Sequence, residues 1–128
     1  MEKTFPMELA RAAGVTPWTF RGRTLLPIVQ GGMGVGVSAG GLAGTVASFD
    51  GVGTISSVDL RRLHPDLMER TGTLEGPGAK AIIDAANREA LARELRRARE
   101  IAGGRGLIAV NVVEALDQYA TYVRHALE

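Results

Sequence analysis

Glycines crowd a short stretch of this chain directly after an apolar run, and that composition is typical of a ligand site. The stretch from Pro27 to Gly36 reads PIVQGGMGVG and contains no charged residue. Because glycine has no Cβ, its peptide N–H and C=O groups can lie close to a flat ring or a phosphate. The spacing matches neither the dinucleotide pattern G-x-G-x-x-G nor the Gly-Lys-Ser/Thr ending of a phosphate loop. A tight turn with close helix–strand packing explains the same glycines, so the residues alone leave both interpretations open.

Asn111 is the second residue with a chemical interpretation. It interrupts the apolar run 107–113, which reads LIAVNVV and is the best strand pattern in the chain. A buried amide is costly unless its hydrogen bonds are satisfied. At the carboxyl end of a strand, Asn111 would donate to and accept from the edge of a heterocycle. A core amide that bonds to a neighbouring strand is the alternative, and the sequence does not choose between the two.

Three strand-and-helix units have to position these residues. The strands are almost uniformly apolar, which is typical of a parallel sheet covered by helices on both faces. The chain is therefore expected to be an α/β protein built from right-handed parallel βαβ units. Ligands bind at the carboxyl ends of such strands, where the glycine run and Asn111 would lie. The predicted strands cover 25–29, 54–58 and 107–113, and the predicted helices cover 42–49, 80–102 and a last segment from about Asp117.

The connecting segments carry weaker patterns. Pro27 has no N–H to donate, so the first strand is expected to pair mainly from Ile28 onward. Asn87 can act as a helix cap, which would divide the long helix into two pieces. We also expect a short helix over 7–13, an extended lead-in over 20–24, and a polar excursion over 59–78 with a helical turn near 63–70.

Composition sets limits on the kind of protein. The 128 residues are 45% hydrophobic and 23% charged, values typical of one soluble globular domain. A net charge of +1 gives no electrostatic footprint for nucleic acid. No stretch approaches the length of a membrane span, and no secretory leader is expected. The absence of cysteine excludes disulfides and thiolate metal sites, so a cytoplasmic protein without a metal centre is expected.

Three blocks of the sequence resemble the nitronate monooxygenase family, formerly called 2-nitropropane dioxygenases. The blocks are LLPIVQGGMGVGVS, LAGTVASFDGVGTISSV and EALARELRRAREIAGGRGLIAVNVV, and they occur in the order of the family. The resemblance implies a TIM barrel that binds FMN at the carboxyl ends of its strands. It also implies that Gly31, Gly32 and Met33 lie along the flavin, largely through backbone groups, and that Asn111 hydrogen-bonds the flavin or its ribityl chain.

The same resemblance implies a flavoprotein oxidoreductase of which these residues hold only a part. Because a TIM barrel needs about 200 residues or more, residues 1–128 are expected to form a single partial (β/α) barrel domain. Its parallel βαβ units would supply about the first three strands of an incomplete TIM barrel, the amino-terminal portion. The implied reaction is FMN-dependent oxidation of an alkyl nitronate with molecular oxygen. The family's catalytic histidine matches neither His64 nor His125, so no catalytic residue is assigned and the isolated chain is expected to be inactive.

Two alternatives stay open. FMN-dependent enoyl-acyl-carrier-protein reductases that use NAD(P)H belong to the same superfamily and share a similar opening block. The second alternative is a catalytically inactive half-barrel that associates with another chain. Three parallel strands leave an open sheet edge, and such edges favour pairing, including self-association.

The remaining charged residues are expected at the surface. His64 lies in the polar segment after the second strand, where a solvated histidine is the expected form. Arginines and glutamates alternate along the long helix in the i, i+4 spacing of a solvated face: Glu89, Arg93, Glu94, Arg96, Arg97, Arg99 and Glu100.

Overall fold

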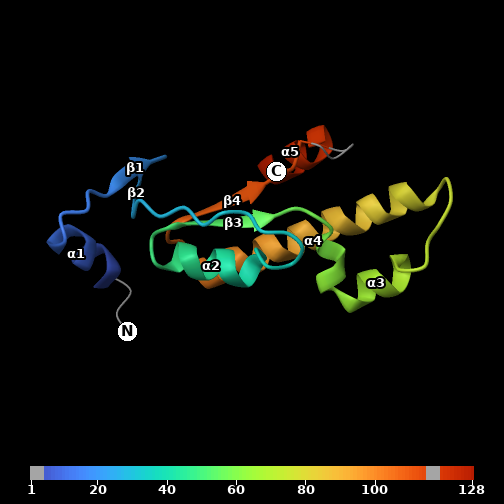
Figure 1. The fold of residues 1–128 in the computed structure, drawn as a ribbon, viewed down its shortest axis with the longest axis horizontal. Coiled ribbons are helices and arrows are strands. Elements are labelled where there is room, and N and C mark those ends of the chain that lie inside the picture. Colours follow the sequence, from blue (N-terminus) through green and yellow to red (C-terminus); the bar gives the residue numbers. More distant parts are fainter. Residues whose placement is uncertain (1–4, 115–118) are drawn as a thin grey trace.

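The structure is a computed structural model, and it describes residues 5–114 and 119–128. The chain forms both helices and short strands (Figure 1). In chain order they are α1 (Phe5–Ala12), β1 (Trp18–Phe20), β2 (Arg23–Leu25), α2 (Gly40–Ser48), β3 (Val52–Ser56), the 3-10 helix η1 (Leu60–Leu63), α3 (Pro65–Thr71), α4 (Ala79–Ala102), β4 (Leu107–Asn111) and α5 (Tyr119–Leu127).

A small parallel sheet forms the centre of the fold. β3 pairs with β4 in parallel, in a register that runs from Val52 opposite Leu107 to Ser56 opposite Asn111. On its other edge β3 meets an earlier part of the chain through a parallel bridge between Val29 and Val52. The expected α/β fold with parallel strands is confirmed, and the sheet that the described residues form does not close into a barrel.

The first predicted strand, 25–29, is wrong as a full strand because only its end pairs with β3. The Val52 N–H donates to the Ile28 carbonyl, and the Gln30 N–H donates to the Val52 carbonyl, each at 2.9 Å. The Ile28 N–H, which would extend this ladder backward, donates instead to the Leu26 carbonyl at 2.8 Å. The expectation that pairing begins at Ile28 is therefore confirmed.

A hairpin replaces the extended lead-in expected before that strand. β1 and β2 pair antiparallel around Arg21 and Gly22, whose φ angles of 50° and 75° suit a primed hairpin turn. The Trp18 Nε1–H donates to the Leu26 carbonyl at 2.9 Å and joins the hairpin to the next segment. Elsewhere the bounds differ little: α2 and β3 begin slightly before their predicted positions, and β4 ends at Asn111.

α4 is a single helix from Ala79 to Ala102, so the predicted division at Asn87 is wrong. Asn87 is buried, and its Oδ1 accepts the N–H of Arg61 from η1 at 3.0 Å. It therefore fastens the excursion after β3 to the long helix instead of capping a second one. The helical turn expected in that excursion is confirmed by η1 and α3.

Close packing of α2 on α4 and on β3 depends on glycine. A Cβ on Gly44 would lie 2.8 Å from the Ala98 carbonyl of α4, and a Cβ on Gly53 would overlap the Ala43 carbonyl of α2. Helix and strand approach this closely only where no side chain separates them. The apolar core surrounds these contacts, and its buried members are Ala43, Ile55, Leu60, Leu67, Ala86, Ala90, Leu91, Ala98 and Tyr122.

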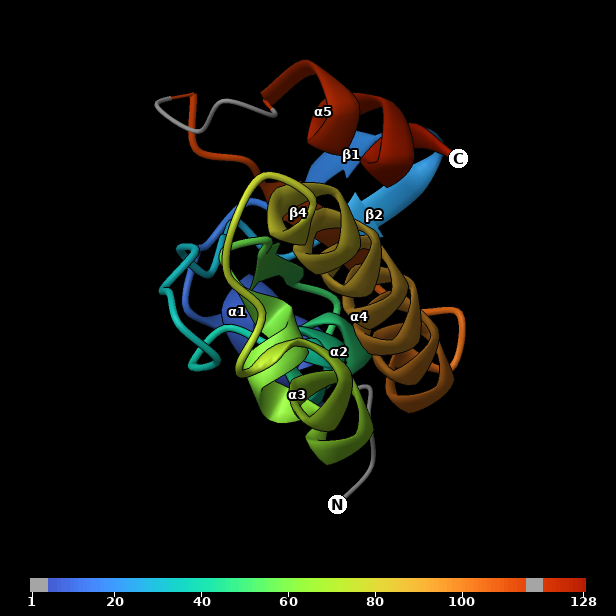
Figure 2. The ribbon, with the colours of Figure 1, turned by 90° about the vertical axis from the view of Figure 1, so that its right-hand side faces the viewer.

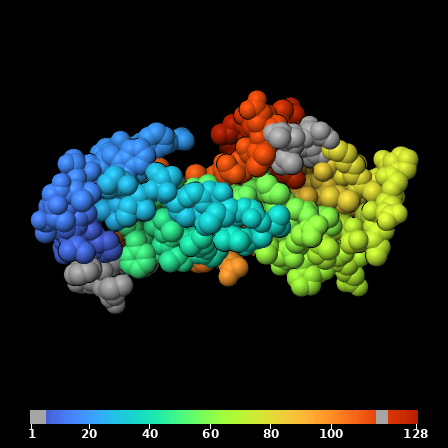
Figure 3. Space-filling view, in the orientation of Figure 1, coloured from blue at the N-terminus to red at the C-terminus, as the bar shows by residue number. Residues whose placement is uncertain are grey.

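The helices lie on both sides of the sheet. α2 lies on one side of β4 and α5 on the other (Figures 1 and 2). The loop between Val29 and α2 crosses the face shown in Figure 3, where its atoms are cyan. The predicted start of the last helix, Asp117, lies outside the described residues, and α5 is described from Tyr119. No described helix combines the length and the apolarity that spanning a bilayer requires.

Candidate functional site

The glycine run and Asn111 meet at the carboxyl ends of β3 and β4. Asn111 is the last residue of β4 and lies opposite Ser56, the last residue of β3. Gly32 passes so close that a Cβ on it would lie 2.6 Å from the Asn111 Cβ. The structure therefore brings together the two chain segments that the resemblance marks for cofactor binding. The four residues concerned, Gly31, Gly32, Met33 and Asn111, are called the rim below.

The surroundings of Gly31 and Gly32 differ in whether they leave room for a side chain. At Gly32 the Asn111 side chain occupies the place that a Cβ would need. Around Gly31, in contrast, no further described atom lies within 4 Å of the position of a Cβ. Packing within the described chain therefore explains the glycine at position 32 but not the one at position 31. Open space beside an exposed peptide is what a flat ligand requires.

Hydrogen bonds inside the loop decide which peptide groups of the rim stay open. The Met33 N–H donates to Ser38 Oγ at 2.9 Å, and the Met33 carbonyl accepts the Ser38 N–H, also at 2.9 Å. The Gly31 carbonyl accepts the Ser38 hydroxyl at 3.1 Å. Among the described residues, no partner is found for the N–H groups of Gly31 and Gly32 or for the Gly32 carbonyl.

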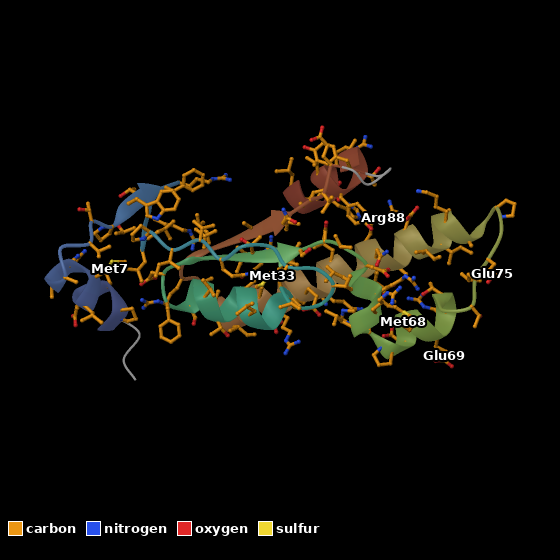
Figure 4. All side chains as sticks on the ribbon, viewed as in Figure 1. Met7, Met33, Met68, Glu69, Glu75 and Arg88 are labelled. Carbon is orange, nitrogen blue, oxygen red and sulfur yellow. The ribbon has the colours of Figure 1, made fainter. Side chains whose placement is uncertain are left out.

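These bonds change what is expected of Met33. The resemblance implies contact largely through the backbone, but both backbone groups of Met33 are bonded to Ser38. The side chain of Met33, labelled in Figure 4, is 46% exposed. A ligand at the rim would therefore meet this residue through its thioether side chain, which adapts readily to flat surfaces.

The Asn111 side chain is exposed, so the alternative of a satisfied core amide is wrong. The backbone carbonyl of Asn111 accepts two bonds from Ser57, from its N–H at 3.1 Å and from its Oγ at 3.0 Å. The side-chain amide has no hydrogen-bond partner within the described part of the chain. It therefore offers a donor and an acceptor beside the bare peptide of Gly32.

A buried glutamate lies elsewhere in the fold. Glu94 was expected on the solvated face of α4, yet it is 3% exposed. Its Oε2 accepts the Gly40 N–H, at the start of α2, at 2.7 Å. Ala39, at the N-cap position of α2, makes no side-chain cap bond. Because unpaired N–H groups and the helix dipole favour a negative charge at a helix start, Glu94 serves as the cap that the local sequence lacks.

His64 is the neighbour of this carboxylate. Its Nε2 lies 3.1 Å from Glu94 Oε1, although the contact is not aligned as a hydrogen bond. Its side chain is only 16% exposed, so the expectation of a solvated histidine is wrong. The sequence did contain a signal for the burial of Glu94, which lies three residues after Leu91 and four before Ala98, on the buried face of α4.

The described groups with shifted pKa values lie on or beside η1, α3, α4 and α5. A hydrogen bond from Arg93 lowers the pKa of Asp66 to about 2. Hydrogen bonds from Arg70 and Arg93 lower the pKa of Glu89. Burial raises the pKa of Tyr122 in α5. The rim, in contrast, presents peptide groups, an amide and a thioether, which are groups without a titratable proton near neutral pH.

Within the described part of the chain, no cluster of three or more His, Cys, Asp or Glu side chains is arranged to hold a metal ion. No protein-family model matches this chain, and no curated protein is significantly similar to it.

Proposed function

We propose that this chain carries part of the flavin site of an FMN-dependent enzyme that oxidises alkyl nitronates with molecular oxygen. The observation that carries the proposal is the contact of Gly32 with Asn111 at the carboxyl ends of two parallel strands. Parallel α/β folds bind their ligands at that edge. The same residues belong to the QGGM and GLIAVN motifs, which resemble the nitronate monooxygenase family.

The residues of the rim fit a flavin ring. A flat heterocycle needs bare peptide on one side, and Gly31 leaves open space there. The polar edge of the ring needs donors and acceptors, which the N–H groups of Gly31 and Gly32 and the Asn111 amide can supply. FMN, when bound, supplies the electron-accepting chemistry. The chain's own groups would orient the ring and stabilise negative charge on it.

The fold is proposed to be the amino-terminal part of a (β/α) barrel. Residues 28–30, β3 and β4 lie side by side in chain order, and helices α2 and α4 connect them. A barrel adds its strands in this sequential order. The first three strands of a classic doubly wound sheet also follow in order, so the barrel is favoured by the resemblance of the motifs. A cytoplasmic location is proposed for such an enzyme, and the lack of cysteine is compatible with that reducing compartment.

FMN binding to the purified protein tests the proposal. A fluorescence titration should show saturable binding, and Gly31→Ala should weaken it because the added methyl group enters the space left for the ring. Gly78→Ala is the matched control, since a Cβ there also meets open space but stands at the start of α4. Asn111→Ala should raise Kd roughly 5- to 150-fold, equivalent to about 1–3 kcal/mol for one lost polar contact. Absence of saturable binding, or equal affinity of Gly31→Ala and Gly78→Ala, would overturn the proposal.

The electron donor separates a nitronate enzyme from the enoyl reductase alternative. Because the isolated chain is expected to be inactive, an FMN-loaded full-length enzyme that contains these residues is mixed without oxygen with an alkyl nitronate in one sample and with NADPH in another. Loss of the visible absorbance of bound flavin with the nitronate supports the proposal. Loss with NADPH alone would overturn it in favour of an FMN-dependent enoyl-acyl-carrier-protein reductase.

A second candidate function is association with another chain, and the exposure and unpaired edge of β4 favour it. β3 is buried along its whole length, whereas β4 is partly exposed and pairs only with β3 among the described residues. Beside β4 lies a hollow of about 750 Å³ whose lining includes Ile108, Val110, Tyr119 and Val123. Figure 3 shows a hollow between the blue β1–β2 hairpin and the orange-red carboxyl-terminal segment.

Unpaired strand edges bind further strands, so the chain should self-associate through β4. Sedimentation velocity over a concentration series should show a weight-average mass that rises with concentration. A monomer at every concentration would contradict this second function and would leave the flavin proposal unaffected.

A further inference from the structure

Ser38 is fully buried at the end of a loop whose residues 31–37 are mostly exposed. Its Oγ accepts the Gln30 Nε2–H at 2.7 Å and the Met33 N–H at 2.9 Å. The same hydroxyl donates to the Gly31 carbonyl at 3.1 Å. One donor and two acceptor positions are all that a serine hydroxyl possesses, so its capacity is used in full.

Gln30 connects the hydrogen bonds of Ser38 to strand β3. Its Oε1 accepts the Thr54 N–H of β3 at 2.9 Å, and its Nε2 also contacts the Gly31 carbonyl. The Ser38 carbonyl accepts the Ser56 N–H of β3 at 2.9 Å. Backbone pairing with β3 ends at Gln30, so Thr54 and Ser56 would otherwise lack partners on that edge. Gln30 and Ser38 together, called the clasp below, therefore join both ends of the loop to the same strand.

The clasp has a consequence for the rim. It engages the Gly31 carbonyl and both backbone groups of Met33. The groups without a partner among the described residues are the two adjacent N–H groups of Gly31 and Gly32 and the Gly32 carbonyl. The buried Ser38 side chain thus determines which peptide groups of the rim remain available to a ligand.

We propose that Ser38 is a positioning residue for the ligand site. Its hydroxyl holds the loop so that the N–H groups of Gly31 and Gly32 stay available in a fixed arrangement before the ligand arrives. Preorganised donors bind more tightly because their ordering does not have to be completed on binding. The inference rests on the proposed flavin function and adds to it a residue outside the rim that controls affinity.

Ser38→Ala tests the inference, with Ser48→Ala as the matched control. Ser48 is also buried, but its Oγ donates to the Thr45 carbonyl within α2 and does not touch the loop. Two quantities are measured on each variant: the hydrogen exchange rate of the Met33 amide without ligand, and the Kd for FMN. Ser38→Ala removes all three hydrogen bonds of the hydroxyl. It should accelerate the exchange and raise Kd, each by about tenfold or more, since one lost buried hydrogen bond corresponds to about that factor. Ser48→Ala should change neither.

Gln30→Glu covers the case in which Ser38→Ala does not fold. This near-isosteric variant keeps an oxygen for the Thr54 N–H but removes the two donors that Gln30 directs at Ser38 and Gly31. It should change both quantities in the same direction as Ser38→Ala. Faster Met33 exchange with an unchanged Kd would overturn the inference and leave the proposed function standing. No FMN binding by the unsubstituted protein would overturn the proposed function, and the inference with it.

Discussion

Replacement of Glu94 by alanine tests whether a distant carboxylate holds the start of α2. The side chain reaches from α4 to the Gly40 N–H at 2.7 Å and lies almost completely buried. Gly40 has no side chain to compensate, since a Cβ there would meet Glu94 itself. Glu94→Ala therefore leaves a buried donor unsatisfied and removes the charge that faces the helix dipole.

The expected loss follows from these two contributions. A hydrogen bond to a charged group contributes about 1.5–3 kcal/mol. A carboxylate at a helix start adds about 0.3–1 kcal/mol. Glu94→Ala should therefore lower the free energy of unfolding by about 2–4 kcal/mol. Glu94→Gln keeps an oxygen for the Gly40 N–H but loses the charge, so its expected cost is about 1–2 kcal/mol.

Urea unfolding followed by circular dichroism measures these differences. Glu100→Ala is the control, because Glu100 is an exposed glutamate on the same helix and surface changes of this kind stay within about 0.5 kcal/mol. The dependence of the free energy on urea should stay the same in all variants, which would show that the same surface is exposed on unfolding. If Glu94→Ala cost no more than Glu100→Ala, the cap assigned to Glu94 would be wrong.

Two further perturbations test the packing and the charge pattern. Gly53→Ala would place a methyl group on the Ala43 carbonyl, so it should cost about 3 kcal/mol or more in urea unfolding. Gly78→Ala, where a Cβ meets open space, is its control, and similar stability of the two variants would contradict the packing of α2 on β3. Acid should also destabilise the fold, because Arg93 lowers the pKa of Asp66 from 3.8 to about 2 and the folded protein then binds fewer protons than the unfolded chain. The contribution of Asp66 to the free energy of unfolding is present above pH 3.8 and is lost as the pH falls through about 2. The effect should be small because the Asp66–Arg93 pair is exposed. Asp66→Asn should weaken the dependence of the urea midpoint on pH in this range, and an unchanged dependence would contradict the prediction.

The meeting of Gly32 and Asn111 is a part of the site that sequence reasoning predicts. Each residue belongs to a segment associated with a predicted strand, and the carboxyl ends of neighbouring parallel strands share one edge of the sheet. The burial of Glu94 was missed for a physical reason as well. A glutamate among arginines is normally solvated, and here its partner Gly40 belongs to another helix.

Local patterns in the sequence by themselves determined β3 and β4, the extent of α4 and a helical turn in the excursion after β3, but not the β1–β2 hairpin or the continuity of α4 at Asn87. Apolar runs and helical periodicity depend on residues a few positions apart, so they can be read without knowledge of the fold. Which glycine serves which purpose was decided only by the tertiary structure. Gly44 and Gly53 allow close packing, whereas Gly31 faces open space. The reason is that the cost of a Cβ depends on the atoms around it, and those atoms come from distant parts of the chain.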